Sequence, residues 1–582
     1  MNKLLVATIA GLLTCGYGLK AAEEADIIIY GSSPAAISAA VQAKRMGKTA
    51  IIVSPEKRIG GLTTGGLGQT DIGNKKAFGG IALEFYRAVS DYYKDKNHWK
   101  WQQREDFIPE EQNVPDEAAS KASKLDSMWL FEPHAALEIL EGWEKRDGLV
   151  IHRGKRLDRA PGRVIVEAKA KGEGGRIAAF FTEDGVEYRG KMFVDATYEG
   201  DLMAAAGVTY FVGREDVRLY GENLGGVNRR CARAHQLSTG VDPYVVKGDK
   251  TSGFLPGIEG YDMGAADGTG DRRVQAYNIR MCLTDVPENR IPFKKPAGYD
   301  ERDYELLFRN YEAHRAAGRT KFTAEWQYEG IPFINSLMPN RKTDTNNRGG
   351  FSTDFIGQNW SWPEASYAER EKIFRAHLKY QQGLMWTLAN HPRIPEGVRA
   401  YMSKWGTTKD EFTDGAGDGW QTQLYVREAR RLVGDYVMTE NHCWGKLKAA
   451  RPIAMGAYQM DSHHVRRYVG ADGCVHNEGD VEEGWQQLAG NPYGVDYGAI
   501  IPKKAECVNL FVPVCMSATH MAFGSIRMEP VFFALGQAAG TAAAQAIDAK
   551  CAVQDLAYAP LAARLEKDGQ VIRVAPKAPA KK

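Results

Sequence analysis

The chain has 582 residues, of which 43% are hydrophobic and 25% are charged, as expected for a globular protein with about two to four domains. Lysine and arginine total 75 against 73 aspartates and glutamates, so the net charge is only +2. This balance argues against a nucleic-acid partner and against electrostatic attraction to an anionic membrane.

The N-terminus has the pattern of an export signal. Lys3 precedes a short apolar run over 4–13, and small residues follow up to Ala21 and Ala22. The run is too short to span a bilayer comfortably, so we predict a signal peptide over 1–22 and a periplasmic or secreted protein. An N-terminal strand or buried helix is the alternative, and Cys15 leaves lipid attachment as a minor option. No later segment is apolar enough to predict a transmembrane anchor.

A strand, a tight turn and a helix come next. Residues 26–30 are an apolar, β-branched run, 31–36 are mostly small, and an alanine-rich stretch continues to Met46. A second apolar strand is predicted over 49–53. Together these segments predict one βαβ unit.

The turn resembles the dinucleotide fingerprint G-x-G-x-x-G/A, with Gly31 first, Ser33 in the second place and Ala36 in the third. Such a turn brings backbone N–H groups at a helix N-terminus to a pyrophosphate. A generic strand–turn–helix is the alternative. Ser54 stands where an acidic residue would bind the ribose, so we expect either Ser54 or Glu56, two residues on, to make that contact.

A second glycine-rich segment follows at 58–68, with glycine pairs at 60–61 and 65–66. Pairs this close predict a chain that passes tightly against a flat or anionic group. A flexible loop is the alternative, but the interleaved leucines disfavour a mere linker.

The middle of the chain is less regular. A helix is predicted over 132–146, a strand from 150, an antiparallel meander over 157–190 and a strand at 192–194. Two later helices are predicted, one at 363–389 and one at 530–547. Apart from the first of these helices, the segment 215–500 has no regular pattern and is rich in aromatic residues.

Four stretches in order carry a specific resemblance: 60–71, 194–201, 460–464 and 525–540. With them the chain resembles the FAD-dependent oxidoreductase family with the glutathione-reductase-like FAD fold, in a bacterial subgroup that is often exported. The resemblance implies an α/β fold: a Rossmann-like FAD-binding domain, with a parallel sheet and a β-meander, plus a large mixed α+β substrate domain.

The resemblance also implies a domain plan and a cofactor. The discontinuous FAD-binding domain is expected at 25–100, 145–215 and 500–550, the substrate or cap domain at 215–500 and a helical insert at 100–145. Separately, the proline-, alanine- and lysine-rich composition of the C-terminus predicts a disordered tail at 570–582. FAD is expected to bind noncovalently. The implied FAD-binding residues are Gly31, Ser33, Pro34, Ala35, Ala36, Ser54, Glu56, Gly60, Gly61, Leu62, Thr63, Leu157, Asp195, Ala196, Asp201 and Glu529.

The cysteines do not form a cluster motif. None of the eight stands in a C-x-x-C pair, so neither an iron–sulfur cluster nor a zinc site is predicted from local spacing. Buried free thiols are the preferred interpretation.

A flavin enzyme needs a group that takes or gives a proton, and histidine suits neutral pH. His463 and His464 are the first candidates; a structural polar turn is the alternative for that segment. His520 and Arg527 flank the approach to the last helix and are the second pair. No second strand–G-x-G-x-x-G–helix unit is present, so the electron acceptor is expected to be oxygen, a quinone or a redox protein rather than a nicotinamide.

The sequence thus predicts an enzyme that transfers hydride from a small polar molecule, sugar-like or a hydroxy acid, to FAD. Two alternatives remain. An electron-transfer subunit with a protein partner would have an exposed apolar patch near the flavin. A binding protein that has lost catalysis would have a blocked cofactor groove.

Overall fold

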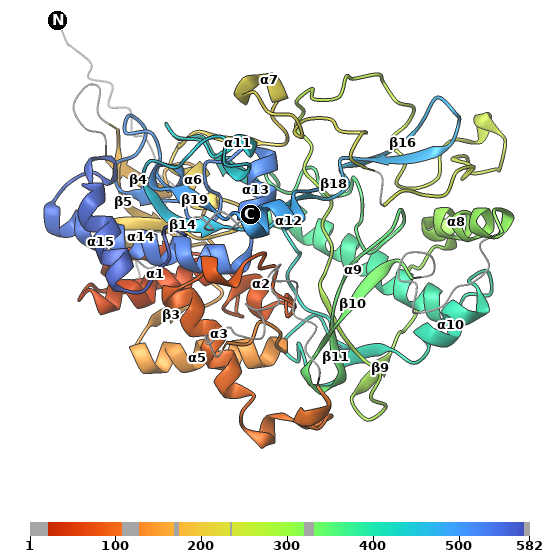
Figure 1. Ribbon diagram of the computed structural model, residues 1–582, viewed down its shortest axis with the longest axis horizontal. Coiled ribbons are helices and arrows are strands. Elements are labelled where there is room, and N and C mark those ends of the chain that lie inside the picture. The colour runs from red at the N-terminus through yellow and green to blue at the C-terminus, as the bar shows by residue number, and fades with distance from the viewer. Residues whose placement is uncertain (1–20, 108–126, 168–173, 233–234, 319–330, 575–582) are drawn as a thin grey trace, which may run out of the picture.

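The computed structural model describes residues 21–107, 127–167, 174–232, 235–318 and 331–574 (Figure 1). The predicted signal peptide, apart from its last two residues, lies outside the described residues, as does the end of the predicted tail. The first residues of that tail are described, and there Gln570 and Ile572 are buried. None of the described helices is both long and apolar enough to cross a membrane. All seven cysteines of the described part are free thiols.

The half of the molecule on the left in Figure 1 is organised around one mixed sheet, in the order β3-β2-β1-β6-β5-β4, with β20 paired to β6. Strands β1, β2, β3, β6 and β20 run parallel, whereas β4, β5 and β6 form the antiparallel meander. The strands are β1 (Glu23–Tyr30), β2 (Ala50–Val53), β3 (Val150–His152), β4 (Val164–Glu167), β5 (Arg176–Phe181), β6 (Glu187–Asp195) and β20 (Leu510–Phe511). This arrangement confirms the predicted α/β fold with a parallel sheet and a β-meander.

Side chains of β1 alternate between two cores, because successive residues of a strand point to opposite faces. Ile27 and Ile29 enter the main core together with residues of the helices, and Ile28 enters a second core with residues of the meander. Both faces of the sheet are therefore covered, which accounts for the nearly continuous apolar run at 26–30.

Two helices far apart in the sequence pack against each other beside this sheet: α1 (Pro34–Arg45) and α14 (Glu529–Ala549). A Cβ atom on Gly536 would lie 2.2 Å from the carbonyl oxygen of Ala35, and one on Gly540 would lie 2.5 Å from that of Ala39. Glycine at these two positions lets the helix backbones approach closely. The remaining helices of this half are α2 (Gly61–Thr64), α3 (Gly80–Tyr92), α5 (Pro133–Asp147), α6 (Asp201–Ala205), α13 (His520–Ile526) and α15 (Tyr558–Lys567).

The other half, on the right in Figure 1, contains a second, antiparallel sheet of five strands in the order β10-β11-β8-β12-β9. Its strands are β8 (Met281–Thr284), β9 (Arg290–Pro292), β10 (Phe333–Met338), β11 (Lys342–Asn347) and β12 (Gly406–Thr408). The helices of this region are α8 (Glu305–Ala316), α9 (Tyr367–Asn390) and α10 (Glu396–Met402). Left of or near the centre of the view lie α7 (Val217–Tyr220), α11 (Glu440–Cys443) and α12 (Trp485–Gly490), and α11 packs against α13.

Helix α9 was predicted to begin at Pro363, and it begins four residues later. Ser366 caps its N-terminus and forms a reciprocal capping box with Glu369, which fixes the first turn there. Four two-stranded ribbons complete the fold: β7 (Tyr210–Val212) with β13 (Arg430–Leu432), β14 (Pro452–Gly456) with β19 (Tyr493–Asp496), β15 (Met460–Ser462) with β18 (Val481–Glu483), and β16 (Arg466–Val469) with β17 (Val475–Glu478).

Candidate functional site

The turn after β1 is held against the turn after β6. Gly31 has φ +113°, and a Cβ atom there would lie 2.6 Å from the backbone of Ala196. The hydroxyl of Ser33 donates to the carbonyl of Ala196 over 2.7 Å, so it does not cap α1. Pro34, the first residue of α1, has no N–H to satisfy. The N-terminus of this twelve-residue helix therefore keeps no side-chain cap, as an anion-binding helix start requires.

Of the two candidates for the ribose contact, Glu56 is the one whose side chain contacts this turn. Ser54 is fully buried and its hydroxyl donates to the backbone carbonyl of Glu56 at 2.7 Å. The Glu56 carboxylate accepts a hydrogen bond from Ser32 at 3.2 Å. Burial and the nearby Glu199 raise the pKa of Glu56 to about 7.

The second glycine-rich segment lies directly over the first turn. Gly60 and Gly61 have φ +89° and +53°, and the N–H of Gly60 donates to the carbonyl of Ser32 at 2.7 Å. The N–H of Leu62 donates to the hydroxyl of Tyr198 at 3.0 Å. A Cβ atom on Gly61 would lie 2.4 Å from that hydroxyl. The segment is therefore a fixed part of the site and not a flexible loop.

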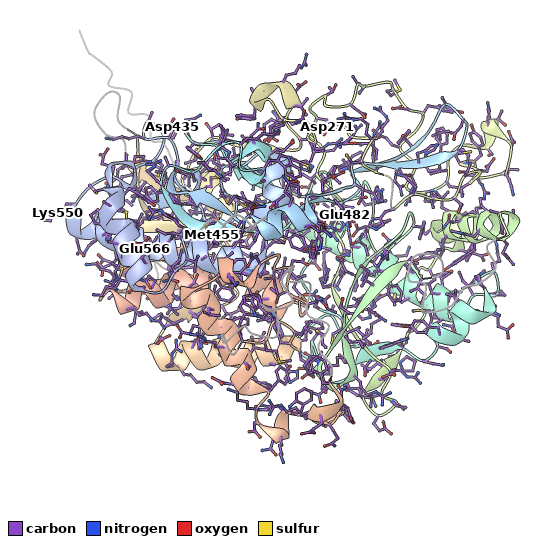
Figure 2. The ribbon with its side chains drawn as sticks, in the orientation of Figure 1. Asp271, Asp435, Met455, Glu482, Lys550 and Glu566 are labelled. Atoms are coloured by element: carbon purple, nitrogen blue, oxygen red, sulfur yellow. The ribbon has the colours of Figure 1, made fainter. Side chains whose placement is uncertain are left out.

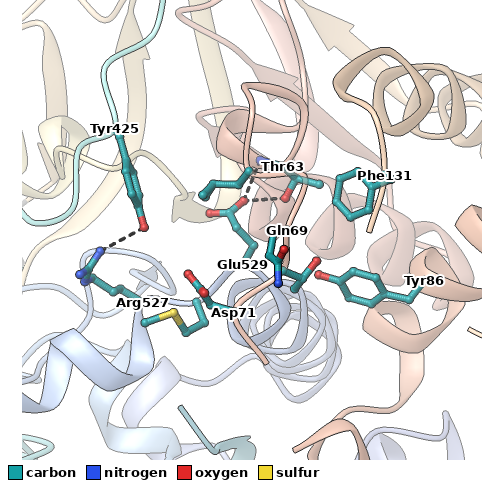
Figure 3. A pocket seen from close by; sticks show the side chains of 11 residues that line it. Thr63, Gln69, Asp71, Tyr86, Phe131, Tyr425, Arg527 and Glu529 are labelled. Atoms are coloured by element: carbon teal, nitrogen blue, oxygen red, sulfur yellow. Dashed lines mark hydrogen bonds between the residues drawn. The ribbon is translucent and has the colours of Figure 1, made fainter. Parts of the chain in front are cut away.

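Glu529, at the start of α14, connects this segment to the last helix (Figure 3). Its carboxylate accepts hydrogen bonds from the N–H of Thr63 at 3.0 Å, from the Thr63 hydroxyl at 2.6 Å and from Tyr198 at 3.0 Å. Burial raises the pKa of Glu529 to about 7. The predicted cofactor residues Thr63 and Glu529 thus touch each other.

A cavity of about 170 Å³ lies at one end of the turn; its lining includes Tyr30, Glu56, Arg156, Thr197, Glu199 and Asp201. Leu157 lies close by, with its N–H donating to Tyr30 and its carbonyl accepting from Tyr367. At the other end, a narrow cavity is lined by Thr63 and Glu529, among others. The open helix start lies between, so the residues present fit an elongated cofactor with an anionic middle, as FAD is.

The two predicted aspartates have protein partners. Asp195 accepts from the N–H and hydroxyl of Thr197 and from the N–H of Met203. Asp201 forms ion pairs with three arginines, Arg159, Arg370 and Arg430. Burial raises the pKa of Asp201, but the arginines outweigh this effect and lower the pKa to about 2. Both carboxylates thus shape the turn after β6, and a direct contact with FAD stays a prediction for each.

A polar cavity of about 280 Å³ adjoins the narrow one. Fifteen residues line it: Gln69, Asp71, His235, Arg280, Ile334, Ser336, Asn346, Asn347, Arg348, Tyr425, Tyr458, Gln459, Asp461, His463 and Glu482. Gln69, Asp71 and Tyr425 line both cavities. Ile334 is the single aliphatic residue of the lining, so the cavity suits a small polar molecule.

Asp71 and Arg280 are site residues to which no role was assigned from the sequence. Burial raises the pKa of Asp71 to about 6, against the lowering effect of Arg280, and the Tyr458 hydroxyl is hydrogen-bonded to its carboxylate. Arg280 forms a buried ion pair with Asp344. Asp71 ends the stretch 60–71, so its position after the glycines was the available signal.

Of the four predicted catalytic residues, the structure brings His463 and Arg527 together. His463 Nδ1 lies 2.8 Å from Asp354 and its Nε2 lies 3.6 Å from Asp461. Burial opposes protonation, but these two carboxylates raise the pKa of His463. Arg527 reaches the same Asp461 carboxylate at 3.1 Å and lines the narrow cavity (Figure 3).

The other two histidines lie behind the cavity. His464 is buried with its ring 6.2 Å from that of His235, and burial lowers the pKa of His464 to about 4. His520 bridges Glu428 at 2.7 Å and the Ser462 hydroxyl at 3.0 Å. Neither residue is part of the cavity lining described above.

One cluster has the composition of a metal site, because ligand atoms of Glu132, His134 and Glu411 lie within 4.8 Å of one another. The ammonium of Lys342 lies 2.8 Å from Glu132 and 2.7 Å from Glu411. A lysine thus supplies the positive charge that these carboxylates require.

Comparison with known proteins gives one extensive match. A family model described as FAD dependent oxidoreductase matches residues 26–565. No curated protein matches the chain.

Partial likenesses exist among solved structures. THI4 from Thermovibrio ammonificans matches with a TM-score of 0.22 and 16% identity over 33% of this chain and 66% of that one. L-amino acid deaminase from Proteus vulgaris matches with a TM-score of 0.22 and 16% identity over 35% and 55%. Thioredoxin reductase from T. acidophilum matches with a TM-score of 0.15 and 18% identity over 30% and 35%. The chain spans less than two thirds of each, and these likenesses support no inference about its activity.

Proposed function

Because this chain belongs to the FAD dependent oxidoreductase family, we propose that it binds FAD noncovalently and oxidises a small polar organic molecule, sugar-like or a hydroxy acid. Bound FAD would accept a hydride from that molecule. The electrons would then pass to oxygen, a quinone or a redox protein.

The continuity of the two cavities carries this proposal. Gln69, Asp71 and Tyr425 line both the narrow cavity at Thr63 and the 280 Å³ cavity beyond it. A flavin held at Thr63 and at the start of α14 would therefore face the second cavity. The helix N-terminus there would stabilise negative charge on a reduced flavin. A polar cavity of this size at this place favours a small substrate over a docked protein.

Within the second cavity we assign His463 as a hydrogen-bond donor to the substrate through its Nε2, which lies 3.6 Å from Asp461. Both of its ring nitrogens face carboxylates, which favours the doubly protonated ring. Arg527 holds the Asp461 carboxylate toward His463 and so keeps this ring oriented. His464 and His520 would act only through the packing of the segment that carries His463.

The first test is an absorbance spectrum of the purified full chain after incubation with FAD and removal of the excess. We expect oxidised-flavin bands that dithionite bleaches and air restores. Denaturation with acid should release the flavin into solution, because no covalent bond holds it. A protein that takes up no FAD would contradict the proposal.

We also propose that the protein is exported, on the pattern of residues 1–22. The check is the N-terminal sequence of the mature protein after expression of the full chain in a bacterium. Cleavage close to Ala22 is the expected result, and an intact Met1 in the cytoplasmic fraction would contradict it.

A further inference from the structure

The charges around the 280 Å³ cavity distinguish between the two substrate classes named above. A hydroxy acid carries a carboxylate, which needs a cation that is not already neutralised. A sugar carries hydroxyl groups only, which need donors and acceptors side by side. The decisive question is therefore whether the cations of the lining are available.

The cations at the inner end of the cavity are engaged. Arg280 is 5% exposed and is paired with Asp344, which is fully buried. The carboxylate of Asp344 also accepts from the N–H of Gln69 at 3.0 Å, which fixes its orientation. His463 lies between Asp354 and Asp461.

The remaining cations of the lining are engaged as well. His235 Nδ1 lies 3.3 Å from the carboxylate of Asp480, and this carboxylate, against the effect of burial, raises the pKa of His235 to about 9. Arg348 also has interaction partners. Each cation of the lining therefore already has at least one partner, and the charge of Arg280 is balanced by Asp344 although its Nε has no hydrogen-bond partner.

Two carboxylates of the lining, by contrast, form no ion pair among the described residues, although the more distant Arg280 lowers the pKa of Asp71. Within the described part of the chain, neither Asp71 nor Glu482 takes part in an ion pair, although Asp71 is hydrogen-bonded to Tyr458. Glu482 lies on β18, near the middle of the view in Figure 2. The unpaired charge that faces the cavity is thus negative.

Neutral hydrogen-bonding side chains make up much of the remaining cavity lining. The side-chain oxygens of Asn346 and Asn347 accept from Arg427 at 3.4 and 3.3 Å, which leaves their NH₂ groups as donors. Gln459 and Ser336 add further donors and acceptors. Amides, hydroxyls and unpaired carboxylates together match a ligand with several hydroxyl groups.

We propose that this cavity takes a neutral polyhydroxylated molecule of the sugar class, and that Asp71 accepts the proton of the hydroxyl group that is oxidised. This proposal rests on the proposed function, because it requires FAD as the oxidant. It excludes a hydroxy acid as the preferred substrate.

The reaction balances with these groups. The carbon that bears the hydroxyl would lose its hydrogen as a hydride, with both electrons of the C–H bond, and bound FAD would be the acceptor. The O–H bond breaks, its proton goes to Asp71, and its electrons form the C=O bond of an aldehyde or ketone. The two electrons would thus be held on bound FAD, and the proton on Asp71 would return to solvent.

The position of Asp71 supports its role. It lines both cavities, so it lies where the flavin and the substrate would meet. Its pKa of about 6, raised by burial, leaves it ionised at neutral pH yet close enough to that pH to take a proton efficiently. His463, whose pKa is raised by its two neighbouring carboxylates, is the less suitable acceptor.

The experiment uses the FAD-loaded full chain under anaerobic conditions and matched pairs of probes: glucose with glucuronate and galactose with galacturonate, plus lactate. Binding is measured as a shift of the thermal midpoint, and oxidation as bleaching of the flavin. We expect at least one neutral sugar to bind at least about tenfold more tightly than its uronate and to bleach the flavin.

Tighter binding of a uronate or of lactate would overturn the proposal, and so would a failure of all the sugars to bind to protein that holds reducible FAD. A protein that holds no FAD would instead contradict the proposed function itself. The two failures are therefore distinguishable.

Asp71→Asn tests the proton acceptor separately. We expect bleaching by the sugar to slow at least about 100-fold while the sugar still shifts the thermal midpoint. Removal of the Asp71 charge should also reduce the ratio of sugar affinity to uronate affinity about tenfold. A purely structural role of Asp71 would leave this ratio unchanged.

Asp435→Asn is the matched control, because Asp435 is exposed and lies well apart from Glu482 in Figure 2. It should leave binding and bleaching unchanged. Equal bleaching by Asp71→Asn and by the unmodified protein would overturn the assignment of Asp71.

Discussion

Glu529 accepts two hydrogen bonds from Thr63, although the two residues are 466 positions apart in the chain. The contact joins the start of α14 to the glycine-rich segment over the nucleotide turn. Tyr198, from the turn after β6, donates to the same carboxylate. One buried side chain therefore fixes three separate segments of the candidate site relative to one another.

Loss of this carboxylate should weaken cofactor binding. Glu529→Ala leaves the N–H of Thr63 and the hydroxyl of Tyr198 without acceptors, at about 1–3 kcal/mol for each buried group. We expect the dissociation constant for FAD, measured by fluorescence titration, to rise at least about tenfold. Glu529→Gln keeps one oxygen acceptor and should show a smaller change. Unaltered FAD affinity in Glu529→Ala would remove this residue from the cofactor site.

Gly31 should not tolerate even a methyl group. It has φ +113°, and a Cβ atom would lie 2.6 Å from the backbone of Ala196. Gly31→Ala should therefore prevent FAD binding and lower the free energy of unfolding by about 3 kcal/mol or more. Gly47→Ala is the control, because Gly47 also has a positive φ, +73°, but nothing lies within 4 Å of an added Cβ. It should cost about 1 kcal/mol and retain FAD; equal effects of the two substitutions would contradict the steric argument.

The His134–Glu411 pair should make stability depend on pH. Burial opposes protonation, but Glu411 outweighs it and raises the pKa of His134 to about 9 from its usual 6.5. A raised histidine pKa contributes stability that is fully present below pH 6.5 and is lost as the pH rises through 9. We expect His134→Gln to lower the free energy of unfolding by about 2 kcal/mol at pH 6 and by much less at pH 10, as measured by urea denaturation. A difference that does not change with pH would show that the imidazole contributes only through packing.

The neighbouring histidines should separate in their effects on turnover. His463 lines the 280 Å³ cavity, whereas His464 lies behind it. We expect His463→Gln to slow anaerobic bleaching of the flavin by substrate about 100-fold or more, and His464→Gln to slow it less than about fivefold. Thermal midpoints of both variants, measured in parallel, separate loss of folding from loss of chemistry. A larger effect at His464 would reverse the assignment.

Local patterns were sufficient to predict the nucleotide half of the fold. Apolar β-branched runs identified β1 and β2, and glycines at 31 and 60–61 marked turns whose φ values are indeed positive. The meander and the two long helices α9 and α14 were also found from their periodicity and their proline boundaries. These elements are determined by neighbouring residues, which is why a single sequence reveals them.

The candidate substrate site depends instead on contacts between distant segments. Asp71, Arg280 and His235 come from three separate regions, and only the fold brings them to one cavity. The sequence selected His464 and His520 for their residue type, but the direction in which each ring points depends on partners such as Glu428. Whether Glu56 or Ser54 faced the turn was likewise decided by the hydrogen bond from Ser32.

The packing of α1 on α14 has a consequence for synthesis. A ribosome makes the first of these helices early and the second only after the intervening residues 46–528. At typical rates of elongation this delay is on the order of half a minute to a minute and a half. During that time the alanine-rich face of α1 has no native partner, and β6 has no β20 beside it. The domain that contains β1 and α1 can therefore complete its packing only after the last helix emerges.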